Sequence, residues 1–303
     1  MSSPFILSLS TVFALVGIVL AAIAFGTNNW QRYTVDRVAL FERMETDAAL
    51  RRNLTTGNIV NQTNLYFNRV IGLFRECYPN ELPSGSNTYR EPLGEQCVTL
   101  TDYQLPEDEQ VTKHWNKDQW TRTHLMRTTV AFYIVGLAFL LLTLFTGILG
   151  CWRRHAGLIL TTGIMLLFAT LFLAASMAVW HGVDYLNREV IRVWPFEQTW
   201  PQWLVNVTKV SYGFSYFVSW AGVALILISS LLMLVAYRSM KEEEADELEK
   251  KAAPYMMASY YDKSALMPYA YGSYPGYGYP AAAYYGQYAN AYNSGYGYMN
   301  YAR

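Results

Sequence analysis

Residues 72–77 read Gly72-Leu73-Phe74-Arg75-Glu76-Cys77, and a second cysteine, Cys97, follows after nineteen intervening residues. The apolar pairs Val70-Ile71 and Leu73-Phe74 beside a cysteine favour a strand that a disulfide would hold to its neighbour. Such a bridge closes a loop of about twenty residues, which is worth about 3 kcal/mol by chain entropy alone. The stretch therefore predicts a small sheet braced by a disulfide.

The sequence on either side of this stretch is that of a membrane protein. Only 15% of the 303 residues are charged, against roughly 25% in an ordinary soluble domain. Asp, Glu, Lys and Arg are all missing from four windows, residues 1–31, 128–152, 155–183 and 210–237. Each window exceeds the roughly 18 mainly apolar residues typical of a membrane span. We therefore predict four spans, near residues 5–25, 129–151, 156–180 and 211–237.

The first window has one alternative interpretation, a cleaved signal peptide, because Ala21, Ala22 and Ala24 resemble a small-residue cleavage site. The window carries no basic residue ahead of its apolar run, and the run is as long as a span. Both features favour an uncleaved span.

The short loop between the second and third spans indicates the orientation. It contains Arg153-Arg154-His155, and basic residues in short loops stay in the cytoplasm. Arg238 and Lys241 after the fourth span agree. Both termini are then cytoplasmic, and the loops 26–128 and 181–210 lie outside the cell or in a lumen. We expect a multi-pass protein of the plasma membrane.

Three glycosylation triplets fall on the predicted outer side. They begin at Asn53, Asn61 and Asn206. Asn206 is the weakest candidate because it lies close to the fourth span.

The three cysteines divide between the two sides of the membrane. Cys77 and Cys97 lie in the outer loop, where an oxidising compartment favours a disulfide between them. Cys151 lies at the cytoplasmic end of the second span beside Trp152 and two arginines, and it is a candidate for palmitoylation or a plain buried thiol.

Catalytic and ligand-binding signals are missing from the sequence. The spans carry no ionisable residue at depth, which argues against a transporter, a pump or an intramembrane hydrolase. The histidines are scattered without ligand spacing, and no nucleophile motif is present, so we expect no enzyme, cofactor or metal. A net charge of zero, with 23 basic and 23 acidic residues, argues against nucleic-acid binding.

Small residues recur in the spans at the spacing that lets helices pack closely, at Gly17 with Ala21 and at Ala174 with Ala178. This spacing fits a four-helix bundle packed on itself, and it equally fits the docking of a partner's helix.

The tryptophan after the first span, Trp30, precedes Gly72-Leu73-Phe74 and the two cysteines in the same outer loop. In this order the chain resembles the claudin superfamily, which includes the calcium-channel gamma subunits and their stargazin-like relatives. That family has tryptophan where this chain has Phe74. The resemblance implies a four-helix transmembrane bundle with a small extracellular antiparallel β-sheet. Trp30 would be an interfacial anchor or a core residue of that sheet.

The gamma-subunit and stargazin branch is the more similar one. Its long glycosylated insertion corresponds to the region of Asn53 and Asn61, and Arg75 and Pro106-Glu107-Asp108 stand at matching places. Residues 72–78 and 184–187 also resemble the transmembrane protein 178 group. The family's common PDZ-binding terminus is replaced here by an ending on Arg303.

The end of the chain divides into two parts. Residues 239–251 are rich in Lys and Glu, and we expect them to continue the fourth span as a short charged helix. Residues 252–303 hold 15 of the 25 tyrosines among Gly, Ala, Pro and Ser. We expect this tail to be disordered, and to act as a tether or to self-associate.

Two functions follow from the resemblance. The preferred one is an auxiliary subunit that binds and modulates a pore-forming ion channel or receptor subunit in the membrane lipid. The alternative is claudin-type cell–cell adhesion or a paracellular barrier, which requires self-association through the outer loops. Glycans in the first loop would hinder close apposition of two cells, so the first function is favoured.

Overall fold

The computed structural model describes residues 3–55, 59–90, 94–100, 103–104, 113–153 and 155–266. For residues 3, 53–55, 151 and 253–266 it describes the backbone alone. The chain forms two compact units, Met1–Glu244 and Ala245–Arg303.

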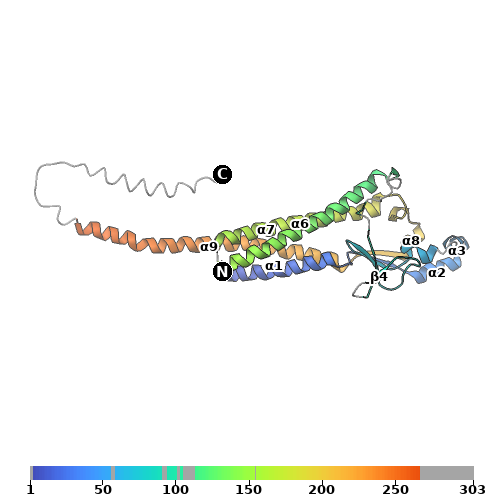
Figure 1. The fold of residues 1–303 in the computed structure, drawn as a ribbon, viewed down its shortest axis with the longest axis horizontal. Helices are drawn as coiled ribbons and strands as arrows, with labels where there is room; N and C mark the ends of the chain where they lie inside the picture. The colour runs from blue at the N-terminus through green and yellow to red at the C-terminus, as the bar shows by residue number, and fades with distance from the viewer. Residues whose placement is uncertain are drawn as a thin grey trace, which may run out of the picture. The chain divides into compact units, whose positions relative to one another are not determined.

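Four long helices in the described residues are apolar enough to cross a membrane. They are α1 (Ser3–Gly26), α6 (Lys117–Arg153), α7 (Ala156–Tyr185) and α9 (Phe214–Leu266), and their apolar parts lie lengthwise beside one another (Figure 1). With the antiparallel sheet described below, they confirm the predicted fold class, and the protein is a tetraspan membrane protein.

Helix α6 begins well before the span expected at residue 129. Asn116 Oδ1 accepts from the Gln119 backbone N–H at 3.2 Å, and Gln119 Oε1 accepts from the Asn116 backbone N–H at 3.0 Å. This reciprocal cap satisfies two backbone donors at the helix start. The apolar span is thus the later part of one helix, whose polar first turns begin at Lys117.

Helix α9 carries the predicted charged segment, residues 239–251, without a break. Within it, Lys251 Nζ pairs with Glu247 at 3.5 Å, the i,i+4 spacing that supports a solvated helix. The helix then continues to Leu266, past residue 252 where we expected disorder to begin. Residues 267–303 of the expected disordered tail lie outside the described residues.

The sheet has six strands in the order β4-β5-β3-β2-β1-β6. Strand β1 (Gln31–Val35) follows α1 directly and pairs antiparallel with β2 (Arg69–Ile71) and with β6 (Thr208–Tyr212). The remaining strands are β3 (Arg75–Tyr78), β4 (Tyr89–Arg90) and β5 (Gln96–Thr99). Because β6 comes from the loop between α7 and α9, that loop and the loop between α1 and α6 build one sheet.

The insertion between β1 and β2 is helical. It contains α2 (Arg37–Thr46), α3 (Ala48–Thr55), α4 (Ile59–Gln62) and a 3-10 turn, η2 (Asn64–Tyr66). The Asp36 side chain caps α2 by accepting from the Ala39 backbone N–H at 3.0 Å. Together with α8 (Gln202–Val207), α2 and α3 lie at the end of the sheet farthest from the four long helices (Figure 1).

The bundle is packed through small residues, as Gly17 and Ala21 predicted. A Cβ built on Gly17 would lie 2.7 Å from Ile226 Cγ1, and one built on Gly222 would lie 3.2 Å from the Ala21 backbone nitrogen. Glycine is therefore required where α1 crosses α9. Ala178, in contrast, is exposed on α7.

Candidate functional site

The residues singled out from the sequence lie where the sheet meets the helical bundle. Trp30 stands between α1 and β1 and is only 1% exposed. Its indole Nε1 donates to the Ala24 carbonyl at 2.9 Å, and its ring centroid lies 5.9 Å from Tyr133 and 5.5 Å from Trp180. Trp30 is thus a core residue that joins the strand to three long helices, and the alternative of an interfacial anchor is wrong.

The Gly-Leu-Phe stretch forms the turn between β2 and β3, against the end of α1. A Cβ on Gly72 would lie 2.7 Å from Asn28 Cα, so only glycine allows this close approach. Leu73 is buried, and the Phe74 ring meets Phe25 edge-on at 5.1 Å. Phe74 therefore fills an aromatic position beside the bundle, where the family has a tryptophan.

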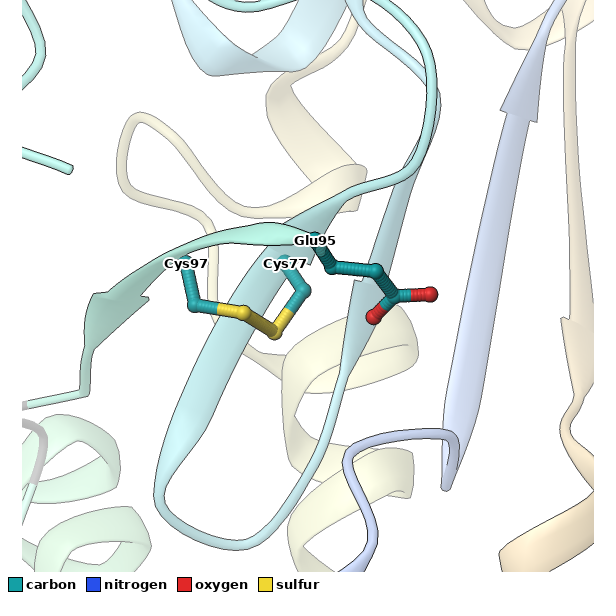
Figure 2. A group of neighbouring side chains, drawn as sticks. All are labelled: Cys77, Glu95 and Cys97. Atoms are coloured by element: carbon teal, nitrogen blue, oxygen red, sulfur yellow. A yellow bond between two sulfur atoms is a disulfide. The ribbon is translucent and has the colours of Figure 1, made fainter. Parts of the chain in front are cut away.

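Cys77 and Cys97 face each other across β3 and β5 and form the predicted disulfide (Figure 2). The Glu95 carboxylate lies within 4.8 Å of both sulfur atoms. Both sulfurs are bonded to each other, so neither is a thiolate that could bind a metal ion. The two cysteines form a covalent brace between β3 and β5. Arg75 lies half-buried at the start of β3.

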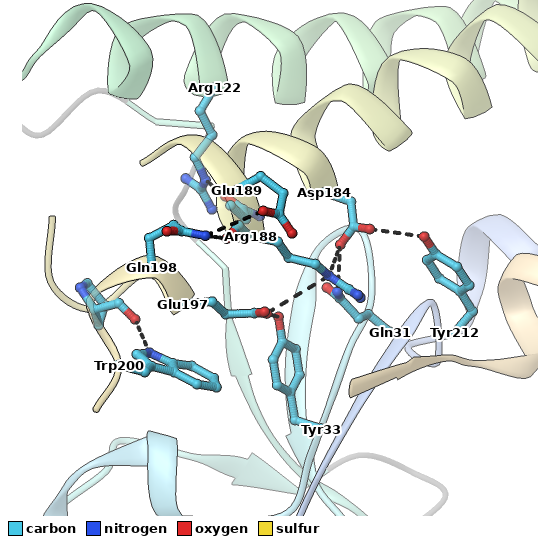
Figure 3. Close-up of polar contacts among 12 residues, drawn as sticks. Gln31, Tyr33, Arg122, Asp184, Arg188, Glu189, Glu197, Gln198, Trp200 and Tyr212 are labelled. Atoms are coloured by element: carbon cyan, nitrogen blue, oxygen red, sulfur yellow. Dashed lines mark hydrogen bonds and ion pairs between the residues drawn. The ribbon is translucent and has the colours of Figure 1, made fainter. Parts of the chain in front are cut away.

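A buried carboxylate forms the polar centre of the junction (Figure 3). Asp184, on α7, is 7% exposed. Its Oδ1 accepts from Gln31 Nε2 at 2.8 Å and from Arg188 Nε at 2.9 Å, and its Oδ2 accepts from the Tyr212 hydroxyl at 3.0 Å. One side chain of α7 therefore binds both β1 and β6, strands that come from the loop after α1 and from the loop after α7.

A second carboxylate extends this network into the loop between α7 and α9. Glu197 Oε1, in the 3-10 turn η4 (Glu197–Thr199), accepts from the Tyr33 hydroxyl at 3.0 Å and lies 4.0 Å from Arg188 Nε. Burial raises the pKa of Tyr33, and the adjacent Glu197 carboxylate raises it further, so the phenol keeps its proton. Burial also raises the pKa of Glu197, against the pull of Arg188.

A cavity of about 320 Å³ lies inside the junction, with Asp184, Gln31, Tyr33 and Arg122 among its walls. The carboxylates that line it are already bonded, since Glu76 pairs with Arg69 at 3.4 Å. Arg122 donates to Asn187 Oδ1 at 2.6 Å. These hydrogen bonds and ion pairs are suited to fixing the sheet on the bundle. The charged side chains Glu76, Asp184 and Arg122 all take part in them.

The buried Glu197 carboxylate predicts a pH dependence of stability. A raised pKa in the folded state means that the folded protein binds more protons than the unfolded chain between the ordinary value of 4.5 and the raised value. The free energy of unfolding should therefore fall as the pH rises through this window. We expect Glu197→Gln, which keeps an oxygen acceptor for Tyr33, to remove that fall.

The measurement is the melting temperature of the purified protein and of the variant between pH 4 and pH 7. At pH 7 the variant should have the higher melting temperature, and the difference between the two proteins should shrink as the pH is lowered. A difference between the two proteins that does not change with pH would contradict the assignment.

The predicted modification sites lie apart from the junction. Asn61, on α4, and Asn206, on α8, are both exposed beside the sheet. The side chains of Asn53 and Cys151 and the whole of residues 106–108 lie outside the described residues. The structure thus shows two of the three glycosylation candidates at the surface.

Sequence reasoning missed the network around Asp184, Arg188 and Glu197. Asp184 follows a charge-free window directly, and Arg188 comes one helical turn later. A carboxylate at the end of a span with a base at i+4 was a usable signal. The pairing with Gln31, Tyr33 and Tyr212 depends on the fold and carries no local signal.

A comparison with known protein families matches most of the first compact unit, Met1–Glu244. The family model described as PMP-22/EMP/MP20/Claudin tight junction matches residues 15–235. The match covers the second half of α1, the whole of α6 and α7, the first part of α9 and both loops that build the sheet. It ends before the charged part of α9.

Proposed function

The chain belongs to the PMP-22/EMP/MP20/claudin family, and from this premise we propose that it binds and modulates a pore-forming ion channel or receptor subunit. In this proposal the sheet lies outside the cell and both termini lie in the cytoplasm. The exposed Asn61 and Asn206 beside the sheet support this orientation, as does Arg153 at the opposite end of the bundle.

The observation that carries the proposal is an apolar surface on the helical insertion. Val38 is 70% exposed and Phe41 is 42% exposed, and the two lie at i,i+3 on one side of α2. Ile59, on α4, is exposed as well. These side chains belong to the sheet end of the molecule, so lipid does not cover them. We propose that Val38 and Phe41, neighbours on one helix face, belong to the surface that contacts the partner.

The junction of sheet and bundle links the helical insertion to the membrane spans. The insertion is attached to β1, which Gln31 and Tyr33 tie to α7 and to the second loop. A partner that binds α2 is therefore held in a fixed relation to the four spans. A subunit shifts gating when it binds one state of the channel better than the other.

Polar groups inside the bundle support binding over transport. Ser229 Oγ donates to the Ser10 carbonyl at 2.7 Å, and Ser230 Oγ donates to the Gly163 carbonyl at 2.8 Å. Such bonds close one helix against another. These serine hydroxyls therefore serve helix packing, and they do not face a transported substrate.

The test is purification of the tagged protein from its native membrane in mild detergent, followed by quantitative mass spectrometry. We expect a pore-forming subunit in stoichiometric amount with the wild type, and its loss with Val38→Asp/Phe41→Gln. The aspartate enters the first turn of α2, where it suits the helix dipole, so the helix should stay folded. Arg43→Gln, exposed on the other side of the same helix, is the matched control and should retain the partner.

Two outcomes would overturn the proposal. Recovery of only further copies of this chain would favour adhesion, the second candidate function. Aggregation of otherwise non-adherent cells by the wild type, lost with Val38→Asp/Phe41→Gln, would then assign the same surface to contact between cells.

A further inference from the structure

An apolar groove lies between α1 and α6, in the half of the bundle away from the sheet. Its volume is about 280 Å³. Residues of all four long helices line it, chiefly Ala14 and Leu15 of α1, Leu144, Gly147 and Ile148 of α6, and Leu166 of α7.

The polar groups in the groove are already used. The hydroxyls of Thr11 and Thr143 each donate to a carbonyl of their own helix at 2.7 Å. The hydroxyl of Thr162 likewise donates to the Leu158 carbonyl at 2.8 Å. The walls therefore offer hydrocarbon contact. A polar occupant would lose its hydrogen bonds to water on entering the groove and would find no partner there.

The groove has the depth of one membrane leaflet. Ile148 precedes the end of α6 at Arg153 by about 7.5 Å of helix, and Thr143 precedes it by about 15 Å. Half of a hydrocarbon core of about 30 Å is about 15 Å. Leu15 and Ile148 are exposed at its mouth, so the groove opens toward the lipid.

We propose that this groove binds one acyl chain of a membrane phospholipid. An acyl chain is narrow and flexible enough to fill the space, whereas a partner helix of about 10–12 Å diameter is not. At the nearby end of α6, Arg153 is exposed, which places a positive charge at the level of the phosphate of a lipid headgroup. Trp152 beside it is 85% exposed, as expected of an aromatic residue at the membrane interface.

The experiment uses the full chain reconstituted with phosphatidylcholine that carries a photoreactive diazirine on its palmitoyl chain. After illumination, mass spectrometry maps the labelled peptides. We expect the label to concentrate on residues 11–18 and 143–148, above the level on the other lipid-facing segments. An excess of unlabelled dipalmitoyl phosphatidylcholine should displace it, and cholesterol should not.

Filling the groove provides the variant. A Cβ on Gly147 meets Thr162 Cγ2 at 3.6 Å, an ordinary contact, so this position accepts a side chain. Gly147→Leu together with Ala14→Leu is designed to occupy the groove, because both positions line it. Labelling of the two segments should fall to the level of the other lipid-facing peptides. Val12→Leu, on the exposed side of α1, is the matched control and should leave the labelling unchanged.

Three results would overturn the proposal. Even labelling of all the lipid-facing segments of the wild type would mean that no site exists. Displacement by cholesterol would identify a sterol as the occupant. Labelling of the two segments that appears only in Cys151→Ser would mean that an acyl chain attached to the protein occupies the groove of the wild type instead. The wild-type mapping and competition stand even if the filled variant does not fold.

Discussion

Replacing Trp30 with alanine is expected to lower the free energy of unfolding by about 3–5 kcal/mol, the usual cost of truncating a buried tryptophan. The indole packs against Tyr133 of α6 and Trp180 of α7, and its Nε1 hydrogen bond ends on the Ala24 carbonyl of α1. Its loss leaves a cavity where three helices meet the sheet, and the Ala24 carbonyl keeps only the longer hydrogen bond from Thr27 Oγ1 at 3.5 Å.

The measurement is the thermal unfolding of the detergent-solubilised protein, followed by fluorescence-detected size exclusion of a fluorescent fusion. Trp152→Ala is the matched control, because Trp152 is exposed at the far end of α6 and its removal should leave the midpoint unchanged. Trp30→Phe should lie between the wild type and the alanine variant. Equal midpoints for Trp30→Ala and Trp152→Ala would contradict the structural role of Trp30.

Removing the disulfide with Cys77→Ser/Cys97→Ser is expected to cost about 3 kcal/mol, mainly because the unfolded chain regains the freedom of a loop of about twenty residues. Both cysteines are fully buried, and β5 is held to the sheet at this point. We therefore expect β4 and β5 to loosen first, with retention of the variant inside the cell.

Surface labelling of cells and the unfolding midpoint both report this effect. Treating the wild type with a reductant should lower its midpoint to that of the double variant, and the variant itself should not respond to the reductant. A wild type that resists reduction but matches the variant in stability would show that the bridge contributes little.

Much of the fold could be predicted from the sequence because membrane spans have a one-dimensional signal. Charge-free windows of sufficient length mark helices wherever the chain crosses lipid, since unpaired backbone groups are not tolerated there. The cysteine pair and Trp30 added the sheet, through resemblance to a known family. Gly17 and Ala21 likewise predicted a close helix crossing, which Gly222 completes.

The helical insertion could not be predicted in the same way. In α2 only Leu40 and Met44 are buried, and charged residues surround them. A short helix with two buried positions has a weak periodicity, and its packing against α8 of the second loop stabilises it. The network at Asp184 is a similar case, because its partners come from segments far apart in the sequence.

The boundary of the tail was placed by composition, and composition changes before the helix ends. Ala252 and Ala253 begin the Tyr-rich region, yet alanine is the best helix former. Helix α9 continues through these alanines to Leu266.

We propose that the protein modulates a pore-forming partner through the surface around Val38 and Phe41. The most direct test is to record currents from the co-purified pore-forming subunit, expressed alone, with the wild type, and with Val38→Asp/Phe41→Gln. The wild type is expected to shift the gating or the surface amount of that subunit, and the double variant, although folded and at the surface, is expected to leave both unchanged. Currents and surface amounts that are the same in all three conditions would contradict it.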